Sequence, residues 1–165
     1  MDLRDSFEQP KPALRMAGPQ DAAEIVRLVN ELAEHHQGRE KVHMSAEQVT
    51  KQLESPKPPF ECILAEFNGK AIGLALFFQN YSTWEGKPGM FLEDIYVDEV
   101  HRRTGVGREL MQKLADICKE RDYGRLDWHA LDWNSDAGTF FSSIGAKRLD
   151  DLHTYRLDGG ALKKL

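Results

Sequence analysis

A short stretch, "VHRRTGVGREL", carries the residue types of an anion-binding turn. Gly105 and Gly107 follow Arg102 and Arg103, and an apolar-periodic segment begins at once. Glycine lets a backbone approach a ligand closely, and the exposed amides at a helix start favour an anion. The successive amides of this turn are therefore expected to bind a pyrophosphate, with Arg102 or Arg103 supplying charge.

Two familiar phosphate loops do not fit this stretch. A Walker loop needs Lys and Ser/Thr directly after its last glycine, where the chain has Arg108 and Glu109. A dinucleotide fingerprint needs a third glycine where Leu110 stands. Two interpretations stay open on spacing alone: a pyrophosphate turn of another kind, or a glycine-rich turn with solvated arginines.

A pair of carboxylates, Glu93 and Asp94, interrupts the otherwise apolar strand "MFLEDIYV". Strand alternation predicts one carboxylate on each face of a sheet. An exposed edge strand would explain them without function, but two adjacent acids among large apolar residues favour a site role for at least one. Five histidines (His35, His36, His43, His129 and His153) have no ligand spacing, so no metal is expected.

Hydrophobic periodicity and turn signals predict the elements that position these residues. Helices are expected from Pro19 to His35, from a Ser45/Gln48 capping box to Pro56, and from the glycine turn to about Asp122. Strands are expected on both sides of Asn68-Gly69 and in the segments MFLEDIYV, RLDWHALDW, AKRL and TYRLD, with a polar loop at QNYSTWEGKPG and a short helix at SDAGTFFSSI. The predicted fold class is α/β or α+β, with helices on both faces of a sheet.

Composition sets the wider frame. The 165 residues suit one domain, expected at 13–165 after a flexible tail at 1–12. A net charge of -5 argues against a nucleic-acid partner. No apolar run approaches the roughly 20 residues that span a bilayer, and the N-terminus has no signal-like apolar segment. With two cysteines lacking a CxxC partner, the expectation is a soluble, cytoplasmic protein without a membrane partner.

Several segments in this order resemble the GCN5-related N-acetyltransferase family, and within it the spermidine/spermine branch with its diamine and thialysine enzymes. They are WEGK at 84–87, LEDIYV at 92–97, RRTGVG at 102–107, DWN at 132–134 and FFSSIGA at 140–146. The resemblance covers about Ala13 to Leu157. It implies a central mixed, mostly antiparallel sheet, acetyl-CoA as co-substrate, a small-molecule amine as substrate, and a homodimer.

The resemblance also implies roles for individual residues. Acetyl-CoA would lie along the strand ending at Val97, with its pyrophosphate on the amides of Arg103 to Arg108. Glu93 would accept the proton of the amine, directly or through water. The implied cofactor-binding residues are Ile95, Tyr96, Val97, Arg102, Arg103, Thr104, Gly105, Val106, Gly107, Arg108, Asn134, Asp136 and Phe141. The implied substrate-binding residues are His35, His36, Trp84, Glu93, Asp94, Asp127, Trp128, His129 and His153.

Two departures from that branch bear on function. Phe141 stands where a tyrosine that protonates the leaving thiolate is expected, so Tyr96, Ser142, Ser143 or water would have to take over; packing is the simpler role for Phe141. Histidines replace the acidic side chains of polyamine-selective relatives, which favours a smaller diamine or a lysine-like amino acid over spermidine. Two alternatives stay open: a protein or peptide N-acetyltransferase, and an acetyl-CoA-binding module with little turnover.

Overall fold

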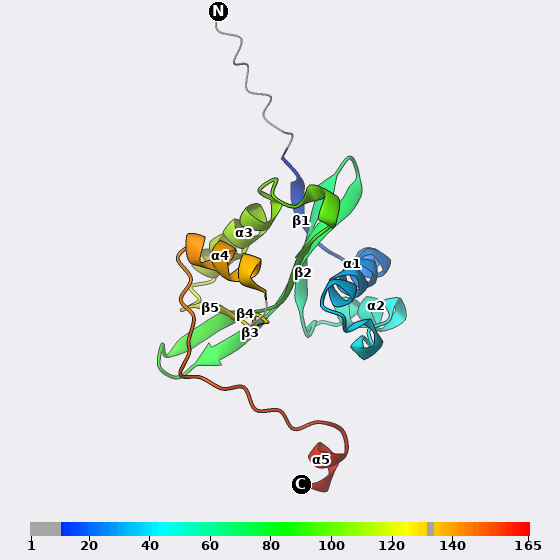
Figure 1. Ribbon diagram of the computed structural model, residues 1–165. Helices are drawn as coiled ribbons and strands as arrows, with labels where there is room; N and C mark the ends of the chain where they lie inside the picture. Colours follow the sequence, from blue (N-terminus) through cyan, green and yellow to red (C-terminus); the bar gives the residue numbers. More distant parts are fainter. Residues whose placement is uncertain (1–10, 132–133) are drawn as a thin grey trace, which may run out of the picture. The chain divides into compact units, whose positions relative to one another are not determined.

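The computed structural model describes residues 11–131 and 134–165 (Figure 1). The chain divides into two compact units, one ending at His129 and the other beginning at Ala130. The predicted tail lies outside the described residues except for Lys11 and Pro12. The expectation of a single domain at 13–165 stays a prediction.

The first unit contains a five-stranded sheet in the order β1-β2-β3-β4-β5. Neighbouring strands are antiparallel except for the parallel pair β4 and β5, which confirms the mixed, mostly antiparallel sheet. The strands are β1 (Ala13–Met16), β2 (Glu61–Phe67), β3 (Lys70–Ser82), β4 (Lys87–Val97) and β5 (Leu126–Trp128).

The helix α2 begins where the sequence places its capping signal. Ser45 and Gln48 form the expected capping box: the Ser45 hydroxyl accepts from Gln48 N, and the Gln48 amide oxygen accepts from Ser45 N. The α-helices are α1 (Ala22–His35), α2 (Ala46–Glu54), α3 (Val106–Glu120), α4 (Ser135–Ser143) and α5 (Gly159–Lys164). Short 3₁₀ turns lie at Pro19–Asp21, Arg39–Lys41 and Glu99–His101.

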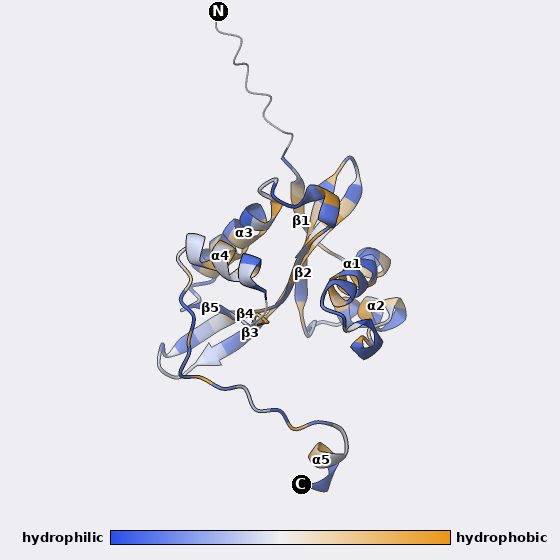
Figure 2. Cartoon of the chain, in the orientation of Figure 1, coloured by the Kyte–Doolittle hydropathy of each residue, from blue (hydrophilic) through white to orange (hydrophobic). Residues whose placement is uncertain are grey.

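Helices cover both faces of the sheet, as expected. The helices α1 and α2 pack on one face, around Ile25, Leu28 and Val49, which are fully buried with residues of β2, β3 and β4. On the other face lies α3, where Leu110 and Leu114 are fully buried. In Figure 2 the strands are orange between the helices, while the far part of the β3–β4 hairpin is pale to blue. The core therefore lies at the helix-covered part of the sheet.

The predicted hairpin at Asn68-Gly69 is confirmed, but the expected polar loop is wrong and the strand β1 was not predicted. Asn68 and Gly69 both have positive φ (51° and 75°), the conformation of a tight two-residue hairpin turn. The segment expected as a polar loop belongs instead to a long hairpin, because β3 runs to Ser82 and β4 begins at Lys87. β1 was not predicted, since its four residues are too short for a periodic signal; it is stabilised by pairing with β2.

The second unit differs from the prediction after α4. The helix expected at SDAGTFFSSI is confirmed, and Gly145 closes it with φ 87°, where Ala146 N donates to Phe141 O. The terminal strands expected at AKRL and TYRLD are absent from the described part of the chain, which has no strand after β5. A strand requires a partner for its ladder, and residues 147–158 are exposed in this chain.

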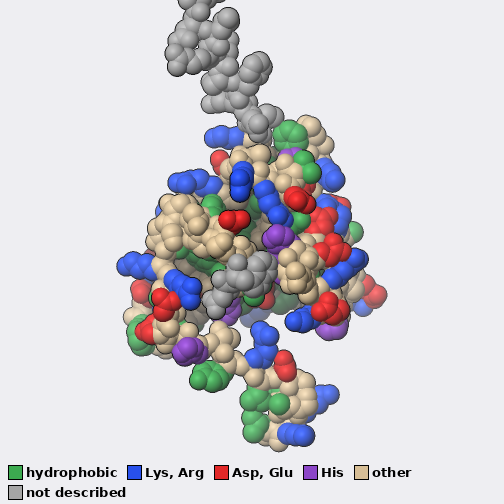
Figure 3. Space-filling view, in the orientation of Figure 1, with side chains coloured by type: hydrophobic (Ala, Val, Ile, Leu, Met, Phe, Trp, Pro, Cys, Tyr) green, Lys and Arg blue, Asp and Glu red, His purple; other side chains and the backbone are tan. Residues whose placement is uncertain are grey.

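Charged side chains of both signs are interspersed over the face seen in Figure 3. None of the helices in the part of the chain that the structure describes is long and apolar enough to span a membrane.

Candidate functional site

The sheet opens at the middle of β4. Strand β5 pairs with β4 only from Met90 to Leu92, whereas β4 stays paired with β3 to Val97. Within the described residues, the second half of β4 therefore has no strand on the side away from β3. Such an edge leaves backbone donors and acceptors available to a ligand.

The ladder between β3 and β4 determines which backbone groups point to this opening. Asp98 N donates to Ile72 O at 2.8 Å, so the pair Ile72/Asp98 is a hydrogen-bonded one. Because such pairs alternate along an antiparallel ladder, Ile95 and Val97, opposite Ala75 and Gly73, direct their amides and carbonyls away from β3. The two residues expected to pair with the pantetheine arm thus present their backbone to the open edge.

A β-bulge lies where the sheet opens. Leu92 is opposite Phe77 and Asp94 is opposite Leu76, so Glu93 is an extra residue of β4. Strand alternation after Leu92 places Glu93 on the face of the sheet that α1 covers. Because Glu93 is an extra residue, Asp94 lies on that same face. The prediction that Glu93 and Asp94 lie on opposite faces of the sheet is therefore wrong: the two carboxylates share one face. Glu93 is exposed there and Asp94 is half-buried.

Burial makes the Asp94 carboxyl a weaker acid than usual. Burial, followed by the charge of Glu93, raises its pKa from the ordinary 3.8 to about 6. In the same row of the sheet, Cys62 is opposite Leu76 and belongs to the α1-face core. Its thiol has a pKa raised to about 12, by burial and then by the charges of Asp21 and Asp94. A carboxyl that titrates near neutral pH thus adjoins a carboxylate open to solvent, and the nearby thiol is unreactive.

Residues of β5 complete this face. Phe91 is opposite Asp127 in the parallel pair, and its ring meets His129 edge-on with centroids 5.0 Å apart. The Arg125 guanidinium holds Asp127 through an Nε–Oδ2 distance of 3.0 Å. Trp128 is opposite Leu92 and so belongs to the other face. The predicted division, Asp127 and His129 on one face and Trp128 on the other, agrees with this register.

The end of α1 approaches the end of β4. The pKa of His36 is lowered by burial first, and then by the charges of His35 and Arg102. His36 therefore lies near both of these residues. Tyr96 is buried in the α1-face core, and burial, then the charge of Glu31, raise the pKa of its hydroxyl. Glu31 is bound by Arg27, which also donates to Ala71 O at 2.7 Å. Glu31 was not predicted as a site residue; its one local signal is the i,i+4 spacing from Arg27, which is typical of an ion pair on a helix surface.

The glycine turn has the backbone geometry expected of an anion cradle. Arg103 and Gly105 both have positive φ, 61° and 90°, and α3 begins directly afterwards at Val106. The first amide of the helix with a helical acceptor belongs to Glu109, which donates to Gly105 O. In the described chain, the amides from Arg103 to Arg108 have no backbone acceptor outside the helix. These amides lie at and just before the N-terminus of α3, where anions are stabilised.

The three arginines of this turn differ. Arg103 and Arg108 are exposed, whereas Arg102 is half-buried and its Nε donates to Val97 O at 3.0 Å. His101 precedes them and is fixed by Asp98, with 2.6 Å between His101 Nδ1 and Asp98 Oδ1. Thr104 is tied to the carbonyl of His101 through its hydroxyl. The turn is therefore held by its own side chains.

Other predicted site residues lie elsewhere in the described structure. Trp84 is 95% exposed in the β3–β4 turn, roughly 20 Å of strand from the bulge. Four belong to the second unit: Asn134 caps α4 by accepting from Ala137 N at 3.2 Å, Phe141 is half-buried beside Phe140, and Asp136 and His153 are exposed. Their roles stay predictions. Asp132 and Trp133 lie outside the described residues.

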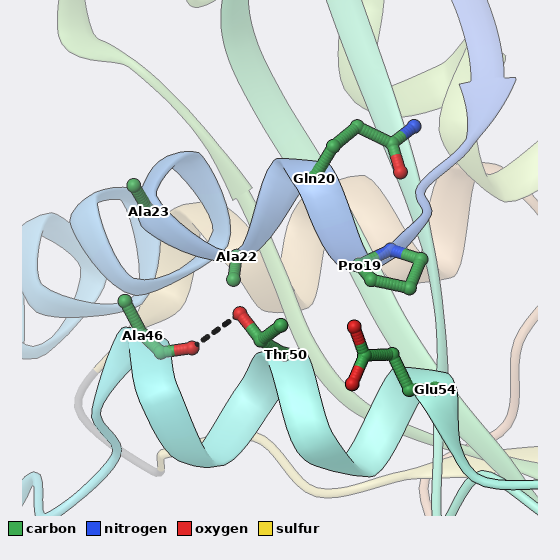
Figure 4. Close-up of a pocket in the computed structure, with 7 residues that line it drawn as sticks. All are labelled: Pro19, Gln20, Ala22, Ala23, Ala46, Thr50 and Glu54. Atoms are coloured by element: carbon green, nitrogen blue, oxygen red, sulfur yellow. Dashed lines mark hydrogen bonds between the residues drawn. The ribbon is translucent and has the colours of Figure 1, made fainter.

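A shallow, open depression of about 580 Å³ lies between the start of α1, with the 3₁₀ turn before it, and the length of α2 (Figure 4). It is lined by Pro19, Gln20, Ala22, Ala23, Ala46, Thr50 and Glu54. In Figure 4 the Thr50 hydroxyl donates to Ala46 O of the same helix, at 2.8 Å. The lining contains one charged side chain and none of the predicted site residues, so the depression is separate from the open edge of β4.

Known proteins have a fold similar to that of this chain. An integron cassette protein from the mobile metagenome of V. cholerae has the same fold, with a TM-score of 0.79, 26% identity, and coverage of 94% of this chain and 97% of that one. The chain belongs to the acetyltransferase (GNAT) family, whose family model matches residues 25–146.

Two curated relatives span nearly the whole chain. A thialysine N-epsilon-acetyltransferase of Bos taurus is 30% identical over 92% of this chain and 95% of its own length. Its counterpart in Caenorhabditis elegans is 31% identical over 88% and 91%. GNAT acetyltransferases use acetyl-CoA as a class, and the resemblance noted in the sequence is thereby confirmed at the level of the family and its diamine/thialysine branch.

Proposed function

We propose that this protein transfers the acetyl group of acetyl-CoA to a primary amine of a small molecule: a diamine, a polyamine or a lysine-like amino acid. The observation that carries the proposal is the β-bulge, which brings two carboxylates to one face of the sheet at the point where β4 loses its β5 partner. The relatives named for thialysine acetylation support the same acceptor class.

Acetyl-CoA would lie at the open edge of β4. The backbone of Ile95 and Val97 would pair with its pantetheine arm, and the amides from Arg103 to Arg108 would bind its pyrophosphate. The exposed guanidiniums of Arg103 and Arg108 would add charge. Asn134, Asp136 and Phe141 of the second unit are proposed as further cofactor contacts.

Glu93 is the proposed proton acceptor. An ammonium ion has no lone pair, so its proton must leave before the nitrogen attacks the thioester carbonyl; the N–C bond forms, the C–S bond breaks, and coenzyme A leaves as a thiolate. Glu93 is exposed beside the opening and can take the proton directly or through water. Asp94, His129 and Asp127 on the same face, with His35 and His36 at the end of α1, are proposed to surround the amine.

The proposal is tested by thiol release from acetyl-CoA against spermidine, spermine, putrescine, thialysine, lysine, small diamines, an aminoglycoside and a peptide N-terminus. Turnover is expected with the small diamines or lysine-like acceptors, and Glu93→Gln is expected to lower kcat by about 10²–10⁴-fold while acetyl-CoA still binds. Turnover only on the peptide would replace the proposal with a protein N-acetyltransferase.

A second function, an acetyl-CoA-binding module, is favoured by one observation: Phe141 has no proton for the leaving thiolate. Under the enzymatic proposal, wild type turns over and Phe141→Tyr changes its rate without being required for it. A wild type silent on every amine, with acetyl-CoA bound and activity gained by Phe141→Tyr, would establish the binding module instead.

We also propose a homodimer in the cytoplasm. The segment after α4 exposes apolar side chains, among them Leu152 (67%) and Tyr155 (93%), and its β-prone sequence has no partner strand in the described chain. A second copy would supply that partner. Both cysteines are free and buried, which fits a reducing compartment. Sedimentation equilibrium is expected to give twice the chain mass, and a monomer at every concentration would refute the dimer.

A further inference from the structure

The side chain of Arg102 is directed back to the sheet. Its Nε donates to Val97 O at 3.0 Å, and its guanidinium carbon lies 5.5 Å from the centroid of the Tyr96 ring. Arg103, one residue later, is exposed. The first arginine of the glycine turn is therefore bonded to the strand on which the acetyl-CoA arm would lie.

The bonded carbonyl is one that the ladder directs to the open edge. Val97 is opposite Gly73 in a pair whose backbone groups point away from β3. Without a side-chain donor, the end of this edge would carry an unpaired carbonyl. A hydrogen bond from a guanidinium is charge-assisted and is among the stronger ones in proteins, so it fixes where the free part of the edge ends.

Arg102 also joins the turn to α1 through Tyr96. The charge of Glu31 raises the pKa of the Tyr96 hydroxyl and that of Arg102 lowers it, so the hydroxyl lies within reach of both. Glu31 is in turn bound to Arg27, with Nη1–Oε1 at 2.7 Å. Arg102 of the glycine turn thus lies against Val97 O and the Tyr96 ring at the end of β4, and the charge of Glu31 of α1 acts on the Tyr96 hydroxyl.

We infer that Arg102 is a positioning residue for acetyl-CoA: it holds the end of β4 and the glycine turn in register through Val97 O and Tyr96, and it does not contact the pyrophosphate. The inference rests on the proposed function. The sequence left open whether Arg102 or Arg103 supplies charge to the phosphates; the inference assigns that role to Arg103, together with Arg108, and not to Arg102.

The test separates the two halves of the cofactor. Calorimetry measures the affinity of the 165-residue chain for acetyl-CoA and for 3′-phospho-ADP, which carries the phosphates without the pantetheine arm. Arg102→Met is expected to weaken acetyl-CoA about tenfold or more, the loss of one charge-assisted hydrogen bond, and to leave 3′-phospho-ADP within about twofold. Arg103→Met, the matched neighbour, is expected to weaken both ligands by similar factors.

Two further variants keep the inference refutable if Arg102→Met folds poorly. Arg102→Lys retains the charge but has no Nε donor, so it is expected to resemble Arg102→Met, whereas a phosphate contact would be largely retained. Tyr96→Phe keeps the ring under the guanidinium and is expected to bind 3′-phospho-ADP like wild type. Equal losses for both ligands in Arg102→Met, or no loss for either, would overturn the inference alone. Failure of wild type to bind acetyl-CoA would overturn the proposed function instead.

Discussion

Replacing Asp94 with Asn is expected to stabilise the protein at neutral pH. Asp94 is half-buried beside Glu93, and burial, then the charge of Glu93, raise the pKa of its carboxyl to about 6. At pH 8 the folded protein must therefore keep a charge that the unfolded chain holds in water. Asparagine has nearly the same shape and removes that charge.

The size and sign follow from proton linkage. A shift from 3.8 to about 6, at about 1.4 kcal/mol per pKa unit, corresponds to about 3 kcal/mol. Because the folded state binds the proton more tightly, the free energy of unfolding falls as pH rises from about 4 to about 6. Below about pH 4 both states are protonated and the penalty is absent; above about pH 7 it is fully present.

Urea denaturation of wild type and Asp94→Asn between pH 4 and 8 measures this directly. The difference in free energy of unfolding, mutant minus wild type, is expected to rise from its acid value by up to about 3 kcal/mol at pH 8. Glu120→Gln, an exposed carboxylate at the end of α3, is the control and should give a flat difference. A flat difference for Asp94→Asn as well would refute the reasoning about burial.

Substitutions at three further positions test the framework. Asp21→Ala is expected to lower the free energy of unfolding by about 2–3 kcal/mol at pH 7, because Asp21 accepts two hydrogen bonds from Arg15 and one from Gly18 N; since these bonds lower its pKa, the loss should shrink below about pH 4, and urea midpoints at pH 3 and 7 check this. Gly105→Ala, at φ 90°, is expected to lose about 1–2 kcal/mol and Gly105→Asn less, because Asn tolerates this conformation; equal losses in thermal unfolding would argue against backbone strain. Leu114 of α3 is fully buried, so Leu114→Ala is expected to lower the free energy of unfolding by about 2–5 kcal/mol. A decrease no larger than that of a substitution at an exposed position would contradict the place of Leu114 in the core.

Local signals were sufficient for the elements that close on themselves. The Ser45/Gln48 capping box and the Asn68-Gly69 turn satisfy their hydrogen bonds within a few residues, and both occur as predicted. The prediction of the terminal strands was wrong for the opposite reason. β-propensity says that a segment fits a sheet, but the partner strand is a long-range property that the residues of the segment do not carry.

The candidate site shows the same division. The sequence identified Glu93 and Asp94 and the glycine turn, because acids in an apolar strand and closely spaced glycines are local signals. It missed the bulge, since a one-residue shift between Leu76 and Phe77 depends on β3 as well as β4. It could not show the bond from Arg102 to Val97 O, which is formed only once the chain turns back.

The bulge also has a consequence for changes in chain length. With Glu93 deleted, Leu92 and Asp94 would still lie opposite Phe77 and Leu76, and every later side chain of β4 would keep its face. The ladder with β3 is therefore complete without this residue, which behaves as a one-residue insertion into a finished sheet. Such an insertion can be gained or lost in evolution without repacking the core, and the group it carries is the proton acceptor proposed for catalysis.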